Sequence, residues 1–374
     1  MTRASIQTPL VEGFPQPTTA VSSIDGGLAY RGFAIEDLVE HSNFLETAYL
    51  VVQGELPSQE QFADMQALIS EASLLDEDLA LWIERLPLNA SSIDALRTSV
   101  SLFALSDIYE EETCTEEVWH TLIRLLAQAP LMIAAKHRIG RGWDLAETRE
   151  DLSYSGNLLF ALTDNEPTPL AERALDAFLI LSAEHELTPS TLAARVAAST
   201  RTDFLSAVIA GMCVLKGIWH GGPGRQVIDI LEAVEVPGAA LPIVTSVLKN
   251  FERMPGFWHR VYRTSDPRSE IILPFCRELS EEAGFSSMEA VSAAIEAAVW
   301  DLQQILPSFD WPAARLLHYL GLDSDLFVPL FAIGRSVGWA AHFLEQQKIP
   351  QPIRLRAHYV GRTKCPYVPL SERG

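Results

Sequence analysis

The two most informative stretches of this sequence are Gly217-Ile218-Trp219-His220-Gly221-Gly222-Pro223-Gly224 and Gly256-Phe257-Trp258-His259-Arg260-Val261-Tyr262-Arg263. Each sets a single histidine among glycines and apolar residues. The second is arginine-rich, and Arg268 follows it closely. Glycine lets the backbone approach a ligand closely, and arginine presents a planar fork of donors that suits carboxylates and phosphates. One such stretch is ordinarily a turn, but two of them predict a site that binds a polyanion.

The composition limits what the protein can bind and where it works. The 374 residues are 48% hydrophobic, enough for a large core and more than one domain. The net charge of −21 argues against nucleic acid and against an anionic membrane as partners, and it makes the basic cluster at 253–268 more informative. No basic-plus-apolar leader is present and no apolar run reaches transmembrane length, so we expect a soluble, cytoplasmic protein. The four cysteines contain no CxxC pair, which fits a reducing compartment and predicts no metal site (Cys114, Cys213, Cys276, Cys365).

Apolar spacings of three and four residues predict an all-α fold. A helical period starts at Ile35 and runs to Val52, and Ser58 with Gln61 has the spacing of a capping box. Pro130 lies inside one candidate helix and should kink it. Alternating β patterns are almost absent, apart from a hairpin or turn around 26–32. The remaining predicted helices are 58–73, 76–86, 91–107, 115–138, 149–163, 168–185, 189–215, 222–233, 240–252, 268–283, 286–305, 310–320 and 325–346.

The last segment, 346–370, differs from the rest in charge. It contains Arg354 and five other basic or histidine residues, with no acidic residue between Glu345 and Glu372. Its prolines favour an extended chain. Two interpretations stay open: a solvated basic tail, or a segment that reaches into an anion site, including one on another subunit.

Ordered blocks along nearly the whole chain resemble the citrate synthase family, which includes the 2-methylcitrate synthases. The blocks are 30–38, 54–57, 184–191, 198–200, 215–222, 256–268 and 325–342. The resemblance implies an all-α homodimer of two-domain subunits, with a cleft that closes on oxaloacetate. The large domain would be 1–220 and 316–374, and the small domain 221–315. Pairing of dimers into larger oligomers stays open.

The resemblance also implies a Claisen-type condensation of an acyl-CoA with oxaloacetate, the citrate-forming step of the tricarboxylic acid cycle. Asp310 would be the base, since a carboxylate between aromatic residues is poorly solvated and more basic. His220 would be a neutral imidazole that donates to the thioester oxygen, and His259 would polarise the ketone. Hydrolysis of the thioester product then drives the reaction forward. No cofactor is implied, because acyl-CoA is itself a substrate.

Further residues match positions that bind the substrates. His185, Arg268 and Arg335 match those that hold the dicarboxylate, and Arg354 matches an arginine contributed by the other subunit. Arg263 matches a contact to CoA phosphate, and Phe331 matches an aromatic residue packed against the product. Alone, Asp310 would be interpreted as a helix N-cap and Arg335 as a buried ion-pair partner; the ordered set favours the functional roles.

The sequence departs from the family pattern beside each catalytic residue, where Trp219, Trp258 and Trp311 stand. One hypothesis is that they reshape the acyl pocket and change the preferred acyl-CoA or keto acid; the alternative is compensated repacking with unchanged chemistry. Three functions therefore remain open. They are a citrate synthase, a 2-methylcitrate or other alkylcitrate synthase, and a catalytically weak relative kept as a CoA- or dicarboxylate-binding regulatory protein.

Overall fold

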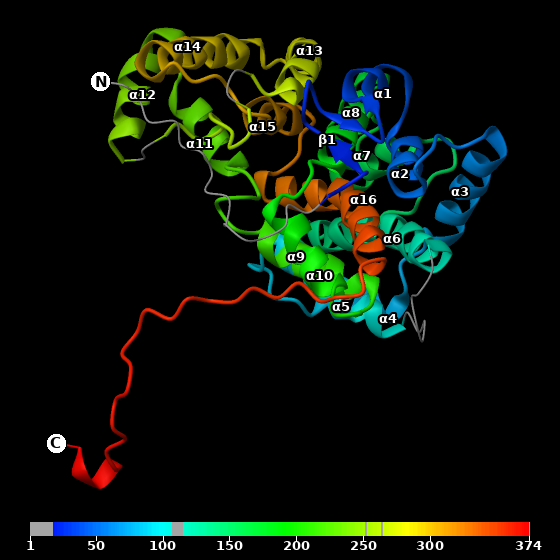
Figure 1. Cartoon of the computed structure of the whole chain (residues 1–374). Coiled ribbons are helices and arrows are strands. Elements are labelled where there is room, and N and C mark those ends of the chain that lie inside the picture. Colours follow the sequence, from blue (N-terminus) through cyan, green and yellow to red (C-terminus); the bar gives the residue numbers. More distant parts are fainter. Residues whose placement is uncertain (1–17, 107–114, 251–252, 263–264, 374) are drawn as a thin grey trace.

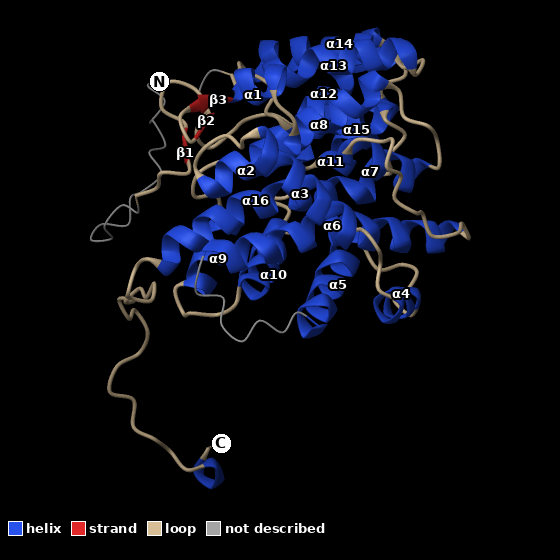
Figure 2. Cartoon of the chain, turned by 90° about the vertical axis from the view of Figure 1, so that its right-hand side faces the viewer, coloured by secondary structure: helices blue, strands red, loops and turns tan. Residues whose placement is uncertain are grey.

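The computed structural model describes residues 18–106, 115–250, 253–262 and 265–373, and within these ranges the chain is almost entirely helical (Figure 2). The all-α prediction is confirmed. The strands that are described form a small antiparallel sheet of β1 (Ser22–Ser23), β2 (Ala29–Tyr30) and β3 (Phe33–Ala34). Its turns lie at the predicted place, with Gly26, Gly27 and Gly32 at positive φ.

The helices of the first half of the chain pack into one body around a central helix that comes from the C-terminal part of the chain (Figure 1). The central helix is α16 (Phe327–Gln347), whose Trp339 and Phe343 are fully buried. The other helices of this body are α1 (Ile35–His41), α2 (Phe44–Gln53), α3 (Gln59–Ala72), α4 (Glu77–Glu84), α5 (Ser92–Ser106), α6 (Thr115–Arg141), α7 (Tyr154–Thr163), α8 (Pro169–Ala183), α9 (Pro189–Ala198) and α10 (Phe204–Leu215).

A second group of helices lies at the upper left of Figure 1. It consists of α11 (Gly224–Ala233), η1 (Pro237–Ala239), α12 (Ala240–Asn250), α13 (Pro267–Glu282), α14 (Ser286–Gln303) and α15 (Asp310–Tyr319). These helices pack mainly on one another, and α13 and α15 also contact α8 of the first body. Helices α11 to α14 fall inside the predicted small-domain range 221–315, whose boundary stays a prediction. A short turn, η2 (Ser324–Leu326), leads back into α16.

Two glycines of α16 let the end of α8 come close enough to carry a site. A Cβ at Gly334 would lie 2.9 Å from the Ser182 side chain, and a Cβ at Gly338 would lie 2.4 Å from the Ala183 carbonyl oxygen. Both distances are shorter than real Cβ contacts, so these two positions need glycine. The close packing places the segment after α8, which begins with Glu184 and His185, directly against the helix that carries Arg335.

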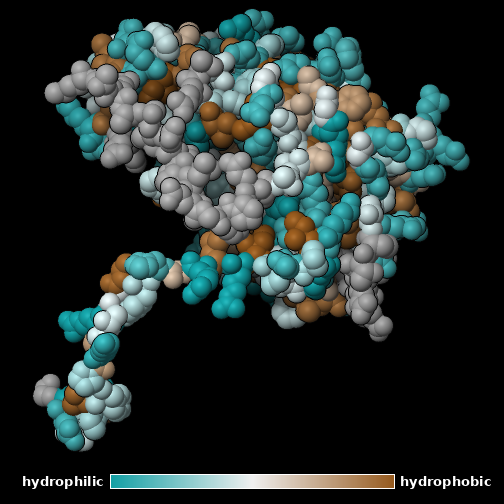
Figure 3. Space-filling view, viewed as in Figure 1, coloured by the Kyte–Doolittle hydropathy of each residue, from teal (hydrophilic) through white to brown (hydrophobic). Residues whose placement is uncertain are grey.

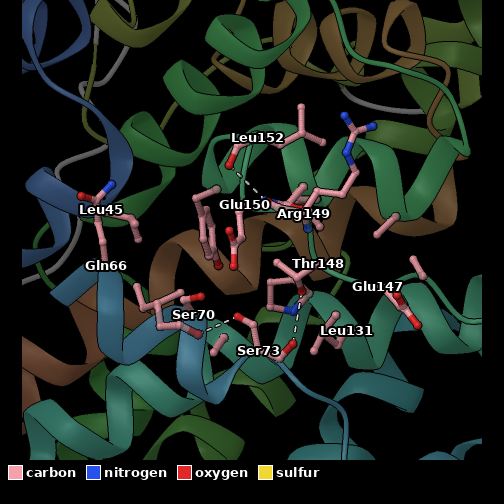
Figure 4. A pocket seen from close by; sticks show the side chains of 18 residues that line it. Leu45, Gln66, Ser70, Ser73, Leu131, Glu147, Thr148, Arg149, Glu150 and Leu152 are labelled. Carbon is pink, nitrogen blue, oxygen red and sulfur yellow. Dashed lines mark hydrogen bonds between the residues drawn. The ribbon is translucent and has the colours of Figure 1, made fainter. Parts of the chain in front are cut away.

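Pro130 is accommodated inside α6, which runs without a break through it. A proline has no N–H, so the carbonyl of Leu126 lacks its helical donor. The Tyr154 hydroxyl donates to that carbonyl at 2.8 Å and takes its place. A pocket of about 240 Å³ lies beside this point, with Ser70, Thr148 and Arg149 among its lining residues (Figure 4). None of the predicted site residues lines it.

Three sequence-based expectations about helices were wrong in detail. The helix predicted from Ile35 to Val52 is two helices, because Asn43 caps α2 by accepting from the Glu46 N–H at 3.0 Å. The predicted helix 189–215 is broken between α9 and α10, where Arg201 has φ 65° and Asp203 caps α10. The third expectation was that no apolar run reaches transmembrane length, but two segments are long and apolar enough to cross a membrane, at 115–141 and 324–347. They are core helices, since 83% and 89% of their apolar windows are buried in the fold.

The segment from Lys348 onward leaves the body as an exposed, extended arm that ends in η3 (Leu370–Glu372) (Figure 1). The predicted extended chain is confirmed. Hydrophilic and hydrophobic side chains alternate along it (Figure 3), and Leu355, Tyr359 and Val360 are 62%, 69% and 88% exposed. Such an arm makes few contacts with its own chain, so its apolar side chains are available to another molecule.

Candidate active site

One cavity brings together most of the predicted site residues. It has a volume of about 550 Å³ and lies between the body around α16 and the helices α13 and α15. The predicted residues that line it are His185, His220, His259, Arg268, Asp310, Phe331 and Arg335. Arg354 does not line it, since it lies on the exposed arm. Arg263 falls outside the described residues.

His220 is held as a neutral ring with a defined tautomer. Its Nε2 accepts from the backbone N–H of Ser190 at 3.1 Å, so Nε2 carries no proton, and the Ser190 hydroxyl donates to the same atom at 2.7 Å. Ser190 lies in the first turn of α9, where helix N–H groups have no partner within the helix. Burial, and then the charge of Arg335, lower the pKa of His220 to about 4. The ring therefore carries its proton on Nδ1.

His259 is neutral as well, but the opposite nitrogen is fixed. Its Nδ1 accepts from the backbone N–H groups of Val261 at 3.2 Å and Tyr262 at 3.4 Å. Burial, and then the charge of Arg268, lower the pKa of His259 to about 4. The proton is consequently on Nε2. The local turn that follows His259 thus fixes its tautomer.

Asp310 is the first residue of α15, and its carboxyl group is poorly solvated. The helix has no side-chain cap, so the interpretation of Asp310 as a structural N-cap is wrong. Burial raises the pKa of Asp310 to about 6, although the charge of Arg268 opposes the rise. The loop of His220 passes beside it, since a Cβ on Gly222 would lie 2.8 Å from Asp310 Oδ1. Gly222 has φ +82°, which also favours glycine.

A short antiparallel pairing ties the His259 loop to the segment that precedes Asp310. Phe257 bridges to Pro307, the Trp258 N–H donates to the Leu306 carbonyl at 3.3 Å, and the Ser308 N–H donates to the Gly256 carbonyl at 2.9 Å. These bonds fix the position of His259 relative to the carboxylate.

Two buried arginines give the cavity positive charge. Arg335 is 1% exposed, and its Nε donates to the Ser182 carbonyl at 2.7 Å. Burial lowers the pKa of Arg335 to about 10, so it stays charged at neutral pH. Arg268 is 5% exposed and forms a two-pronged ion pair with Asp266, at 2.7 Å and 3.0 Å. An anion in this cavity would have both guanidinium groups within its walls.

His185 belongs to an aromatic cluster on the same wall. Its Nε2 is hydrogen-bonded to the Tyr262 hydroxyl at 2.9 Å, and its ring packs edge-on against His259 at 5.1 Å between centroids. Burial, and then Arg268, lower its pKa well below the ordinary value. Behind it, the fully buried Glu184 accepts from His342 and from Ser22, each at 3.0 Å. This network fixes the backbone of the segment that carries His185.

Sequence reasoning gave no separate role to Ser190 or Asp266. Ser190 sets the tautomer of His220 from 30 residues away. Asp266 is 2% exposed and accepts from Arg268 and from the Phe309 N–H at 3.1 Å, next to Asp310. Both signals are present in the sequence, as Thr188-Pro189-Ser190 has the pattern of a helix start and Asp266-Pro267 that of a capped one. The pattern predicts a cap; only the fold shows which other group the cap residue contacts.

The three tryptophans separate into two classes. Trp311 is fully buried, and its indole N–H donates to Ser292 at 3.0 Å and Glu296 at 2.8 Å. It does not line the cavity, which favours the repacking alternative for this residue. Trp219 and Trp258 do line the cavity, with exposures of 84% and 41%. Trp258 has φ 77°, a left-handed conformation that costs a non-glycine residue roughly 1–2 kcal/mol.

The cavity contains arginines, two neutral imidazole rings that can donate hydrogen bonds, and one carboxylate with a raised pKa. This set defines an acid–base enzyme that acts on an anionic substrate. Comparison with known proteins makes this class specific. The family model described as "Citrate synthase, C-terminal domain" matches residues 10–356. The chain belongs to the citrate synthase family, and it is therefore an enzyme of the acyltransferase class.

Individual relatives agree with this assignment. The chain is 35% identical over 365 residues to citrate synthase 2 of Bacillus subtilis, covering 97% of this chain and 98% of the relative. It is 33% identical to a 2-methylcitrate synthase of Shewanella oneidensis, covering 95% of each. A solved citrate synthase from Thermoplasma acidophilum, in ternary complex with carboxymethyl coenzyme A and oxaloacetate, superposes with a TM-score of 0.89 at 25% identity, covering 96% of this chain and 98% of that one.

Proposed function

We propose that this enzyme condenses acetyl-CoA with oxaloacetate to give citrate and CoA, with Asp310 as the base. The observation that carries the proposal is the meeting of Asp310, His220 and His259 around one cavity, with the two rings neutral and the carboxylate pKa raised. A thioester α-carbon is a very weak acid. Its proton can be removed only if a base is matched by donors that stabilise the oxygen on which charge develops.

The acceptor, oxaloacetate, binds first through its carboxylates. Arg335 and Arg268 are the charged groups for this task, since both are buried and both line the cavity. His185 adds a third contact from the same wall. His259, whose proton is on Nε2, donates to the ketone oxygen and makes the carbonyl carbon more electrophilic. Phe331 packs against Arg335, with the guanidinium carbon 4.9 Å from the ring centroid, and limits its movement.

Condensation then needs two proton transfers and one new carbon–carbon bond. Asp310 takes a proton from the α-carbon of acetyl-CoA, while the Nδ1–H of His220 donates to the thioester oxygen. The resulting enolate, stabilised by that hydrogen bond, attacks the ketone carbon, and a carbon–carbon bond forms as the π bond of the ketone breaks. The ketone oxygen takes the Nε2 proton of His259 and becomes a hydroxyl. Asp310 then releases its proton to solvent and His259 takes one back, which restores both groups. Water next attacks the thioester of the product, the carbon–sulfur bond breaks, and CoA leaves as a thiol. No step uses a cofactor or a metal ion.

We further propose a homodimer with a shared active site. The exposed arm from Lys348 carries Arg354 away from its own cavity and presents apolar side chains to solvent. Binding across a second copy would bury those side chains and bring Arg354 to the partner's oxaloacetate. Whether dimers associate further depends on surfaces outside this arm. Among the described cysteines, Cys213, Cys276 and Cys365 are free thiols, which supports a cytoplasmic location.

The test is release of free CoA thiol from acetyl-CoA. We expect release that requires oxaloacetate, and loss of that release in Asp310→Ala. Asp301→Ala is the matched control, because Asp301 is an exposed aspartate of α14 outside the cavity. Thiol release that is independent of oxaloacetate, or that survives in Asp310→Ala, would contradict the proposal. A protein that binds both compounds without releasing thiol would be a regulatory binding protein instead.

The same assay with propionyl-CoA addresses the alternative of a 2-methylcitrate synthase, to which the 33% identity with the Shewanella oneidensis enzyme points. A higher kcat/KM with propionyl-CoA than with acetyl-CoA would favour that function. Relatives of both kinds match at similar identity, so overall similarity does not separate the two substrates.

A further inference from the structure

The backbone at Trp258 is unfavourable for its side chain. Its φ of 77° is a conformation that glycine adopts freely and that tryptophan rarely adopts. The residue lies between the buried Phe257 and the proposed catalytic His259. A strained non-glycine residue at a functional site is retained when its side chain has a use. The indole of Trp258 is therefore the group to explain.

A cation covers one face of the indole, and Trp258 lines the cavity. The backbone N–H of Trp258 donates to the Leu306 carbonyl at 3.3 Å, which fixes the backbone at this residue. The guanidinium carbon of Arg253 lies 3.7 Å from the ring centroid and covers one ring face. The exposed 41% of the residue contributes to the wall of the cavity, together with His259 and Asp310. The result is an apolar part of the wall in the cavity that holds His259 and Asp310.

Each of the other two tryptophans lacks one of these properties. Trp311 is fully buried and contributes nothing to the cavity surface. Trp219 lines the cavity, but it is 84% exposed and no cation covers its ring in the described structure. A side chain that is mostly in water is a poor steric barrier, because it moves aside at little cost.

We propose that Trp258 is a specificity-determining residue that limits the acyl group of the thioester to acetyl. This inference rests on the proposed function. The acyl α-carbon must reach Asp310 while the ketone lies on His259, the residue that directly follows Trp258. Carbons beyond the α-carbon then approach the indole, and Arg253 and the Leu306 pairing prevent the ring from yielding. The wall leaves acetyl-CoA unhindered and excludes longer acyl chains.

The experiment compares kcat/KM for acetyl-, propionyl- and butyryl-CoA in the full-length wild type and in Trp258→Gly. Glycine suits a φ of 77°, so the variant should fold, and its thermal unfolding is measured alongside. We expect the butyryl-to-acetyl ratio to rise at least ~10-fold, the discrimination typical of one or two methylene groups in an apolar pocket. Trp258→Phe, with a smaller ring, should give an intermediate ratio.

Trp300→Ala is the matched control, because Trp300 is 43% exposed on α14 and does not line the cavity. Its acyl ratios should equal those of the wild type. If a folded, active Trp258→Gly variant shows an unchanged butyryl-to-acetyl ratio, the proposed role of Trp258 in acyl-chain specificity is wrong and the proposed function is unaffected. Equal loss with all three acyl-CoAs also overturns that role, since Trp258 would then support catalysis generally. Absence of thiol release in the wild type with every acyl-CoA defeats the proposed function and this inference together.

Discussion

The His220 and His259 rings have the same protonation state, but different contacts fix their tautomers. Both rings are neutral, with pKa values lowered to about 4. His220 is fixed at Nε2 by Ser190, a residue of helix α9, whereas His259 is fixed at Nδ1 by N–H groups two and three residues further along its own turn. The two rings therefore present opposite nitrogens to the cavity. A histidine tautomer can be set by tertiary or by local structure, so we expect mutations to affect the two rings differently.

The largest expected effect comes from removing each ring in turn. His220→Ala and His259→Ala should each lower kcat by ~10²–10⁴-fold, the usual range for a positioned acid, base or charge-stabilising donor. The comparison predicts a further difference. His259→Ala should still exchange the α-hydrogens of acetyl-CoA with deuterated water when L-malate occupies the acceptor site, because His220 and Asp310 remain. His220→Ala should not.

Mass spectrometry of the recovered acetyl-CoA measures that exchange. If the two variants exchange at the same rate, the division of labour between the rings is wrong, whatever their effect on condensation.

The next effect concerns the close approach of the His220 loop to the base. Gly222→Ala places a Cβ about 2.8 Å from Asp310 Oδ1 at φ +82°, and we expect activity to fall by ~10²-fold because a displacement of about 1 Å at the reacting groups has that cost. Gly321→Ala is the control. Gly321 has φ +76° with nothing within 4 Å of the added Cβ, so it carries the backbone strain without the contact.

Both variants should lose roughly 1 kcal/mol of stability to the left-handed backbone, measured by denaturant unfolding. Equal activity in the two variants would mean that the contact with Asp310 has no catalytic weight.

A smaller effect separates tertiary from local control of the tautomer. Ser190→Ala removes the hydroxyl that donates to His220 Nε2 at 2.7 Å but keeps the backbone N–H. The loss of one hydrogen bond, ~0.5–1.5 kcal/mol, predicts a fall in kcat of ~2–10-fold. Imidazole NMR signals should show a higher pKa for His220 and an unchanged one for His259. A shift at His259 would show that the two rings are coupled, contrary to the comparison.

The smallest effect is the pH dependence of activity, which tests Asp310 as the base. A base acts when it is deprotonated, and burial raises the pKa of Asp310 to about 6. Activity should therefore rise with pH through about 6, with half of the maximum at that value. Neither ring should contribute a step between pH 5 and 8, since both pKa values are about 4. The Ser308 hydroxyl lowers the pKa of Asp310, so removing it in Ser308→Ala should move the pH profile to higher pH. A wild-type profile that stays flat down to pH 5 would contradict the assignment of Asp310 as the base.

Much of the fold follows from local sequence. Apolar periodicity predicted the helices, and Ser58 with Gln61 forms the capping box that the spacing indicated. The helix breaks at Asn43 and Arg201 were missed because the apolar period continues across them, whereas a side-chain cap and a left-handed residue end the hydrogen bonding. Local pattern therefore indicates where a helix can form better than where it stops.

The candidate site was less accessible to sequence reasoning. The resemblance placed three histidines, several arginines and Asp310 in one site. The cavity contains His185, His220, His259, Arg268, Asp310 and Arg335 but not Arg354. The protonated nitrogen of His220 was not predictable, because it depends on a helix start 30 residues away. Similarly, three tryptophans next to catalytic residues looked equivalent in the sequence. Only burial separates Trp311, bonded to Ser292 and Glu296, from the two that line the cavity.

Asp266 joins two tasks that an enzyme would otherwise adjust separately. One of its oxygens accepts from both the Arg268 guanidinium and the Phe309 N–H. The same carboxylate therefore positions the arginine proposed to bind the acceptor and the residue next to the proposed base. A change at Asp266 cannot tighten substrate binding without also moving the end of α15 that carries Asp310, the proposed base. Natural variation in this enzyme must therefore adjust affinity for oxaloacetate elsewhere, and position 266 is expected to tolerate almost no drift.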